Sequence, residues 1–256
     1  MSLIRYECTD GCARITMTNP ERGNVFSPEA GDELREAILR AKADAARVIV
    51  LAAEGKYFSV GGDLAGFAAV DDMEPYLLDL AEGVNRIVTE LVRCDAVVIS
   101  AVQGTAAGVG FPLAAAADIV VASEKAKFSL AYAKVGLSPD GGGSLLVHTL
   151  GLHRVLRLTL LGDMLSASEA LDAGLVARVV PADGLEAAVD EVVANLLSGS
   201  PEALARTKHL VRGVADPNPE SALRREAQSI SALGGSASGR EGINAFLEKR
   251  APSFGA

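Results

Sequence analysis

Residues 96–110, AVVISAVQGTAAGVG, carry the strongest indication of the fold. Their first half, Ala96 to Val102, is an almost continuous apolar run rich in β-branched side chains. Such a run is typical of a parallel β-strand that is buried on both faces. Glycines 104, 108 and 110 follow it and predict a tight turn into a helix, because glycine tolerates backbone conformations that other residues avoid.

Similar apolar runs on either side of this stretch extend the pattern to a parallel sheet. Residues 47–53, RVIVLAA, and residues 118–122, DIVVA, have the same character, and residues 72–94 follow a helical pattern. The resulting order is strand, helix, strand, glycine turn, helix, strand. This order requires crossover connections and predicts an α/β fold with a parallel sheet.

The two ends of the chain have patterns of their own. Residues 2–8 and 12–18 are predicted as short strands around Asp10-Gly11, a dipeptide typical of hairpins. Much of the C-terminal sequence is helical. The Gly- and Ser-rich segment 233–239 predicts a mobile hinge, and a last helix is expected at about 240–250.

Composition excludes several classes of protein. The chain has 256 residues, 49% hydrophobic and 22% charged, and no long uncharged apolar run, so neither disorder nor a transmembrane helix is expected. A net charge of −9 with 4% aromatic residues argues against a nucleic-acid-binding protein. Three cysteines without a matching Cys or His pair predict reduced thiols and no metal site. Since no secretion signal is evident, we expect a cytoplasmic protein.

Two glycine turns are the first candidate site. Residues 56–64, KYFSVGGDL, and residues 103–110, QGTAAGVG, each follow a predicted buried strand. Backbone N–H groups in such turns point toward a ligand near a helix N-terminus. Neither turn has the pattern of a phosphate loop. Together they are able to direct two N–H donors at one oxygen, which is the arrangement of an oxyanion hole.

Four motifs occur in an order known from one enzyme family. Residues 58–64, FSVGGDL, match the pattern Phe-x-x-Gly-x-Asp, and residues 101–110, AVQGTAAGVG, follow as a second glycine motif. Residues 136–143, GLSPDGGG, and residues 241–250, EGINAFLEKR, complete the series. The chain therefore resembles the enoyl-CoA hydratase/isomerase (crotonase) superfamily over essentially its whole length. The Pro-Asp-x-Gly-Gly pattern is closest to isomerase-type members, the Δ3,Δ2-enoyl-CoA isomerases and the ring-epoxide isomerases of phenylacetyl-CoA breakdown.

This resemblance implies a fold, a substrate class and an assembly. The expected fold is a crotonase-like spiral of ββα units, residues 1–195, that holds an acyl-CoA site. A helical C-terminal trimerisation region, residues 196–256, follows it. The substrates are acyl-CoA or enoyl-CoA thioesters, and because coenzyme A is part of the substrate no separate cofactor is expected. A homotrimer or homohexamer is implied, with no nucleic-acid or membrane partner.

The resemblance also assigns residues to the oxyanion hole. By position, the backbone N–H groups of Val60 and Val109 are the two donors that would stabilise the enolate of the thioester. Gly61, Gly62 and Gly108 would line the substrate site beside them. One well-placed donor of this kind is typically worth about 10²–10³ in rate.

Both glutamates of the family's hydratases are absent from this chain. The matching positions hold Pro112 and Tyr132. Proline has no acid or base function, and tyrosine, with a reference pKa of about 10, is a poor base at neutral pH. Hydration by a glutamate pair is therefore disfavoured, and Tyr132 is expected to contact the substrate.

A third position, Asp140, is the expected acid and base. Without the family, Pro139-Asp140-Gly141 would be interpreted as a turn. Several isomerase-type subgroups place their acting carboxylate at this position, and a related dehalogenase uses an Asp in this region as nucleophile. Partial burial near Leu137 would raise the pKa of the carboxyl toward a useful value.

Coenzyme A also needs cations. Arg22, Lys56 and Lys249 are the expected phosphate contacts, and Lys249 in the last helix is placed to act on a neighbouring subunit's ligand. The leading hypothesis is double-bond isomerisation in an acyl-CoA, with Asp140 moving the proton. The alternatives are a hydratase with atypical water activation, a CoA-thioester dehalogenase or hydrolase with Asp140 as nucleophile, and a non-catalytic acyl-CoA-binding protein.

Overall fold

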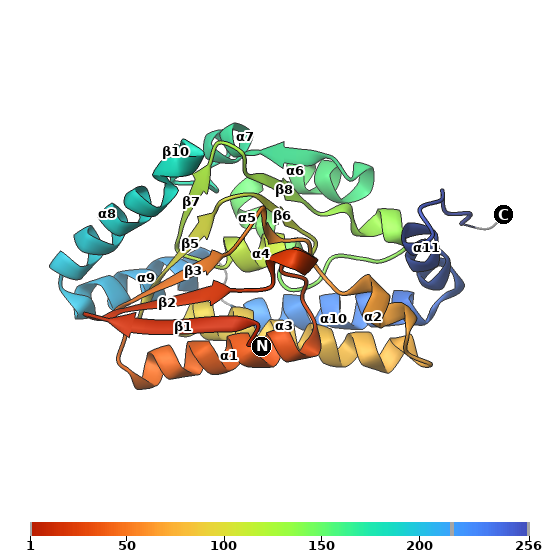
Figure 1. Cartoon of the computed structure of the whole chain (residues 1–256), viewed down its shortest axis with the longest axis horizontal. Coiled ribbons are helices and arrows are strands. Elements are labelled where there is room, and N and C mark those ends of the chain that lie inside the picture. The colour runs from red at the N-terminus through yellow and green to blue at the C-terminus, as the bar shows by residue number, and fades with distance from the viewer. Residues whose placement is uncertain (1, 216–217, 255–256) are drawn as a thin grey trace.

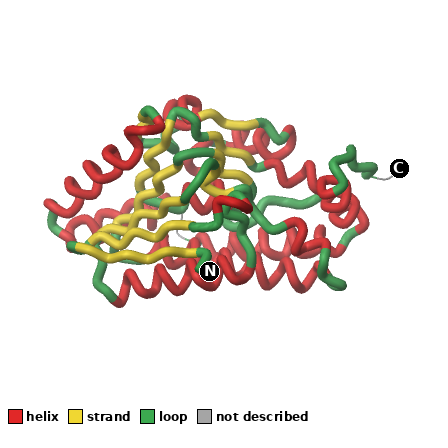
Figure 2. The backbone as a smooth tube through the Cα atoms, viewed as in Figure 1, coloured by secondary structure: helices red, strands yellow, loops and turns green. Residues whose placement is uncertain are grey.

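A computed structural model describes residues 2–215 and 218–254 and shows a six-stranded sheet flanked by helices (Figures 1 and 2). The strand order is β1-β2-β3-β5-β7-β10. Its strands are β1 (Ile4–Thr9), β2 (Cys12–Met17), β3 (Val48–Ala53), β5 (Val97–Val102), β7 (Ile119–Ser123) and β10 (Arg178–Val180). Only the β1–β2 pair is antiparallel, and the other pairs are parallel. The predicted hairpin and parallel sheet are therefore confirmed.

The central strands are apolar throughout because both of their faces are covered. In β5, Val98 and Val102 belong to a large core on one face, whereas Ile99 and Ala101 belong to a smaller core on the other. Figure 1 shows helices α1 (Pro28–Ala43), α3 (Met73–Arg93) and α10 (Pro219–Gly235) below the sheet. Helix α8 (Leu185–Ser198) packs on the opposite face. The central strands therefore lack an alternation of apolar and polar residues.

A second, four-stranded sheet completes the ββα units. Its order is β4-β6-β8-β9, from β4 (Tyr57–Ser59), β6 (Thr105–Ala107), β8 (Lys127–Ser129) and β9 (Met164–Ser166). Strands β4, β6 and β8 each follow directly on a strand of the first sheet, which confirms the predicted crotonase-like spiral. The sequence pattern predicted glycine turns at β4 and β6 and did not distinguish the short strands within them.

The remaining helices are short or C-terminal. They are α2 (Leu64–Ala68), α4 (Gly110–Ala115), α5 (Val147–Leu150), α6 (Leu152–Leu156), α7 (Ala167–Asp172), α9 (Pro201–Ala215) and α11 (Ala237–Leu247). Short helical turns are η1 (Pro20–Arg22), η2 (Ala131–Val135), η3 (Ser144–Leu146), η4 (Arg157–Leu161) and η5 (Ala182–Gly184). No helix within the described ranges combines the length and the apolar character needed to cross a membrane.

Helices α10 and α11 are built into the main core. The predicted boundary at residue 195 falls inside α8, and Leu223, Ala227 and Ile230 of α10 share one core with α3. The predicted hinge at 233–239 is wrong. Helix α10 continues to Gly235 and α11 begins at Ala237, so only Ser236 separates the two helices. The glycines of this segment leave room for close packing of α10 and α11, because a side chain at Gly234 or Gly239 would clash with its neighbours.

Candidate functional site

The two glycine turns lie against each other, as the sequence predicted for a shared site. A side chain at Gly61 would lie 2.9 Å from the Ala107 carbonyl oxygen and 3.2 Å from Gly108 Cα. Both Gly61, with φ +94°, and Gly108, with φ +52°, have positive φ. The close approach therefore depends on the missing side chains as well as on the backbone conformation.

The first turn is held by polar residues that sequence reasoning did not assign. The Ser59 hydroxyl donates to the Asn24 carbonyl oxygen at 2.8 Å and accepts the Gly61 N–H at 3.1 Å. The Asn24 side-chain amide donates to the carbonyl oxygens of Glu54 and Tyr57 at 2.9 and 2.8 Å. These bonds give Ser59 a structural role in the turn.

The two predicted oxyanion donors differ in their hydrogen bonding. Val109 N–H, at the start of α4, makes no hydrogen bond to the described residues. Val60 N–H donates to the Gly23 carbonyl oxygen at 3.0 Å. A substrate oxygen would therefore bind the Val109 donor directly, but it would have to share or replace the Gly23 oxygen at Val60.

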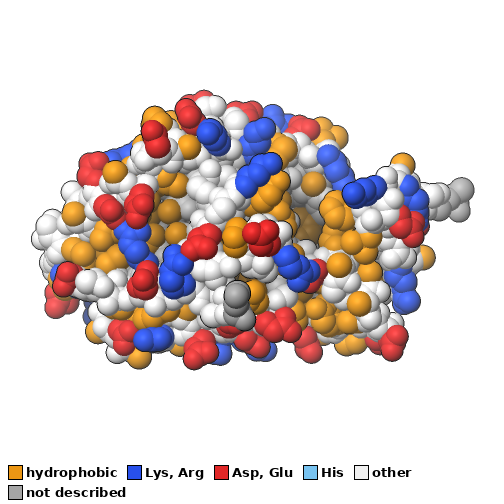
Figure 3. Space-filling model, viewed as in Figure 1, with side chains coloured by type: hydrophobic (Ala, Val, Ile, Leu, Met, Phe, Trp, Pro, Cys, Tyr) orange, Lys and Arg blue, Asp and Glu red, His pale blue; other side chains and the backbone are white. Residues whose placement is uncertain are grey.

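An apolar pocket of about 290 Å³ opens beside these turns. Its walls come from the two turns, from α2, α3 and η2, and from α10 and α11. It is lined by Phe26, Val60, Gly62, Leu64, Phe67, Leu77, Leu80, Val84, Ala107, Gly108, Val109, Ser129, Ala131, Tyr132, Val135, Leu137, Asp140, Ile230 and Phe246. Figure 3 shows hydrophobic side chains around a hollow near the end of the molecule that carries α2 and α11.

Asp140 is the carboxylic acid in this lining. Its side chain is buried, with the residue 6% exposed, and its Oδ1 accepts a hydrogen bond from the Tyr132 hydroxyl at 2.7 Å. Burial raises the pKa of Asp140 to about 6, the Tyr132 hydrogen bond opposes that shift, and the charge of Glu226 adds to it. The carboxyl is therefore balanced between its two protonation states at about pH 6 and is mostly ionised at neutral pH.

Tyr132 is a hydrogen-bond donor rather than a base. Burial and the neighbouring Asp140 charge raise the pKa of its phenol well above the ordinary value. The phenol therefore keeps its proton at neutral pH. Family hydratases carry a glutamate at the position of Tyr132. In this chain the Tyr132 hydroxyl instead donates a hydrogen bond that stabilises the ionised form of Asp140.

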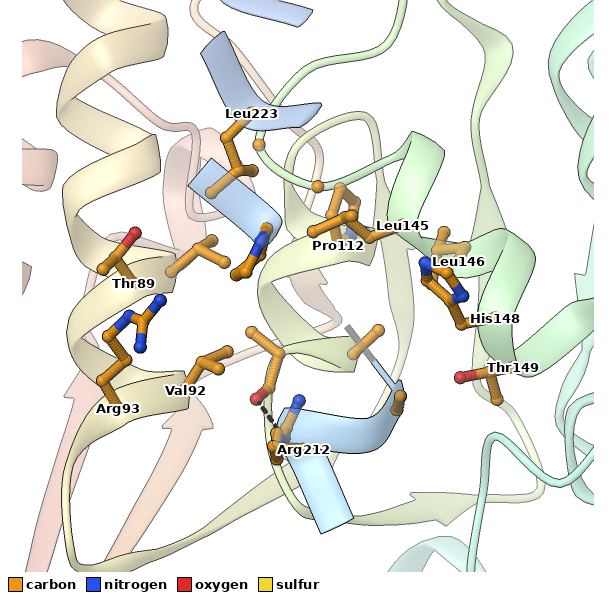
Figure 4. Close-up of a pocket in the computed structure, with 17 residues that line it drawn as sticks. Thr89, Val92, Arg93, Pro112, Leu145, Leu146, His148, Thr149, Arg212 and Leu223 are labelled. Carbon is orange, nitrogen blue, oxygen red and sulfur yellow. Dashed lines mark hydrogen bonds between the residues drawn. The ribbon is translucent and has the colours of Figure 1, made fainter. Parts of the chain in front are cut away.

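A second pocket, of about 140 Å³, is shown in Figure 4, and residues that follow Asp140 form part of its wall. Gly141 and Gly142 line it together with Pro112, Leu145 and Leu223. Pro112 thus faces this second pocket and is not among the residues that line the pocket with Asp140. The site containing Asp140 gains no acid or base from that position.

Glu226 was missed by sequence reasoning. Its carboxylate is buried on α10 and accepts the backbone N–H groups of Gly142 and Ser144, each at 2.7 Å. Burial raises the pKa of Glu226. In the sequence it follows Arg224 and Arg225 and has the pattern of a solvated helix face, so no local signal distinguishes it.

The three predicted phosphate contacts lie on exposed segments. Arg22 forms an ion pair with Asp63 at 2.9 Å, and Lys56 lies 5.1 Å from the ring centre of Tyr57. The turn at Gly23 joins Arg22 to the pocket, because a side chain there would meet Val60. Lys249 follows α11, whose Phe246 lines the pocket.

Asp63 has a structural role beside the site. Its side chain caps α2 by accepting the Gly66 N–H at 3.2 Å. The same carboxylate holds Arg22, so it connects the helix cap to the turn that carries the predicted phosphate contact.

Comparison with known proteins shows the family to which the chain is similar. The sequence matches the enoyl-CoA hydratase/isomerase family over residues 7–256. It is 37% identical to a probable enoyl-CoA hydratase of Rhodobacter capsulatus, covering 98% of this chain and 97% of that protein. It is 35% identical to the 1,2-epoxyphenylacetyl-CoA isomerase of Escherichia coli, covering 99% and 98%.

A solved structure confirms the fold. The crystal structure of an enoyl-CoA hydratase from Mycobacterium avium subsp. paratuberculosis superposes with a TM-score of 0.91, at 34% identity and with complete coverage of both chains. This chain therefore belongs to the enoyl-CoA hydratase/isomerase family, within the crotonase superfamily.

Proposed function

We propose that this protein moves a carbon–carbon double bond in an acyl-CoA thioester, with Asp140 as the acid and base. The observation that carries the proposal is the buried Asp140 carboxyl, hydrogen-bonded to Tyr132 in an apolar pocket beside the Val109 turn. A carboxyl with a pKa of about 6 is suited both to accept and to return a proton near neutral pH.

The reaction consists of two proton transfers. The Asp140 carboxylate removes a proton from one carbon of the enoyl chain, and the electron pair of that C–H bond delocalises onto the thioester oxygen. The Val109 N–H, joined by the Val60 N–H, stabilises the negative oxygen. Protonated Asp140 then returns the proton two carbons away, and the double bond is displaced. Because electrons are neither gained nor lost overall, we propose that no resident cofactor takes part.

The lining of the pocket favours isomerisation over hydration. A hydratase of this family uses two glutamates to hold and activate water, and Pro112 and Tyr132 stand at those positions. Asp140 is the carboxylate in the described lining, and Tyr132 donates to it. One carboxylate suffices for a proton shuttle within the substrate.

Coenzyme A would bind at the pocket mouth through its phosphates. Arg22 and Lys56 flank the turn at Gly23, and Lys249 lies beyond Phe246. Since exposed charge pairs are screened by salt, affinity for acyl-CoA should fall as ionic strength rises. Free coenzyme A should compete with substrate, and NAD should not.

The decisive experiment is incubation with 3-enoyl, 2-enoyl and ring-epoxide CoA thioesters, with products identified by mass and NMR. An isomeric product of unchanged mass supports the proposal, and deuterium from heavy water should enter the α or γ carbon where exchange occurs. A product heavier by one water would instead assign hydration, the activity named for the Rhodobacter relative. Tight binding without turnover would identify a non-catalytic acyl-CoA-binding protein.

Asp140→Asn tests the assignment of the base. This substitution keeps the shape and the acceptor for Tyr132 but removes proton transfer. Turnover should fall by about 10²–10⁴, the usual contribution of general acid–base catalysis. Affinity for substrate should change little. A fully active variant would return Pro139-Asp140-Gly141 to an ordinary turn.

A further inference from the structure

The loop that carries Asp140, residues 138–144, is buried at its centre and rich in glycine. Three consecutive glycines follow Asp140, and Gly141 and Gly142 have φ +62° and +99°. The Asp140 side chain lines the apolar pocket, whereas Gly141 and Gly142 line the second pocket. Glycines have no side chains with which to form hydrogen bonds, so polar groups of neighbouring elements must supply the bonds that fix this backbone.

Helix α10 contacts this loop on both sides of Asp140. Two residues after it, Glu226 accepts the Gly142 N–H, and the second oxygen of the same carboxylate accepts the Ser144 N–H. Two residues before it, the Ser138 hydroxyl is bonded to the Ser229 hydroxyl at 2.8 Å. Bonds to an ionised, buried acceptor are the strong ones among these, because charge strengthens a hydrogen bond in a dry surrounding.

The same helix forms part of the wall of the apolar pocket. Ile230, one turn after Glu226, lines the pocket with Asp140. Helix α10 is in turn fixed to α3 by other buried bonds, among them the Ser231 hydroxyl donating to the Glu74 carbonyl oxygen at 2.7 Å. The loop therefore takes its position from a rigid element of the core.

We propose that Glu226 is the positioning residue of the active site: its carboxylate, by holding the Gly142 and Ser144 N–H groups, fixes the loop so that Asp140 faces the substrate. The proposal rests on the proposed function, because it assumes that Asp140 moves the proton. Glu226 does not line the pocket and acts through Asp140 alone.

Glu226→Gln is the principal test. The glutamine side chain has one acceptor oxygen and one NH2 group, which is a donor. One of the two backbone N–H groups therefore loses its acceptor and faces the NH2 group instead. We expect kcat to fall by about 10- to 100-fold, because a small displacement of a reacting group is costly, while KM changes by less than about threefold. The negative charge that faces Asp140 is also lost, and Tyr132 is the other titratable group facing it. The acid limb of the pH profile should therefore move to lower pH.

Two further variants separate geometry from charge. Glu226→Asp keeps the charge on a shorter arm, so kcat should fall while the acid limb stays in place. Ser231→Ala removes a buried α10 hydrogen bond away from the loop and serves as the matched control. It should lower the melting temperature and leave kcat unchanged. If Glu226→Gln does not fold, the Glu226→Asp variant carries the kinetic test.

The double variant Asp140→Asn, Glu226→Gln distinguishes the two proposals. If Glu226 acts through Asp140, adding Glu226→Gln to Asp140→Asn should cause no further loss of kcat. Additive losses would overturn the positioning role. Unchanged kcat in both folded Glu226 variants would also overturn it. Faster hydrogen exchange of the Gly142 and Ser144 amides in those variants would then show a structural role only. Full activity of Asp140→Asn alone would instead overturn the proposed function.

Discussion

At the scale of single residues, the pair formed by Tyr132 and Asp140 decides how the site responds to pH. The Asp140 carboxylate must be ionised to accept a proton, and its pKa is about 6. For the wild type, kcat/KM should therefore rise through about pH 6 and level off above it. The Tyr132 hydrogen bond lowers that pKa, so Tyr132→Phe should shift the acid limb to higher pH. A pH profile of kcat/KM for both proteins measures this, and coincident acid limbs would contradict it.

The raised pKa of Asp140 also carries a cost in stability. The folded pKa of about 6 lies above the ordinary aspartate pKa of 3.8, so the folded state prefers the protonated carboxyl. The stabilisation that this preference adds to the free energy of unfolding is complete below about pH 4. It is lost as pH rises through 6. Asp140→Asn stays neutral and should be the more stable protein, with an advantage that grows by about 1 kcal/mol between pH 5 and pH 8. Denaturant unfolding at both pH values tests this, and a constant difference would argue against it.

At the scale of elements, the contact between the two glycine turns should tolerate no side chain. Gly61→Ala would place a Cβ 2.9 Å from the Ala107 oxygen at a φ of +94°. We expect a loss of about 1–3 kcal/mol in the free energy of unfolding. Turnover should fall at least tenfold, because both N–H donors are displaced.

Gly83→Ala is the matched control for this prediction. Gly83 lies within α3, and an added Cβ meets nothing within 4 Å. The substitution should raise the free energy of unfolding by about 0.5–1 kcal/mol and leave turnover unchanged. Equal behaviour of Gly61→Ala and Gly83→Ala in unfolding and turnover would show that the contact between the turns is unimportant.

At the scale of the whole molecule, exposed leucines favour the trimer or hexamer that the resemblance implies. On α6 and η4, Leu160 and Leu161 are 70% and 65% exposed, and Leu152, Leu156 and Met164 are exposed nearby. Apolar groups gathered in this way are typical of an interface. We expect a trimer or hexamer at micromolar concentration in sedimentation velocity. Leu160→Asp should shift the distribution toward smaller species, and a wild-type monomer would refute this assembly.

The same scale shows what sequence could reveal of this protein. Apolar runs such as that ending at Val102 predicted the parallel sheet because burial on both faces leaves a local pattern. Asp140 and the glycine turns were found because motifs preserve them. Glu226 could not be found, because its partners lie more than 80 residues away in sequence and its neighbours are charged. The prediction of a hinge at 233–239 was wrong because glycine is typical both of flexible segments and of closely packed helices.

The bond between Val60 N–H and the Gly23 carbonyl oxygen makes the site a competition between two acceptors. A thioester carbonyl is a weaker acceptor than a peptide carbonyl, so an uncharged substrate should leave this bond in place. An enolate oxygen carries negative charge and should replace the Gly23 oxygen as the acceptor of the Val60 N–H. The second donor would then be recruited only as charge develops, which discriminates the activated state from the resting one. A CoA ligand that ends in a nitronate anion should accordingly bind at least about 10²-fold more tightly than a saturated acyl-CoA of equal length, as calorimetry can measure.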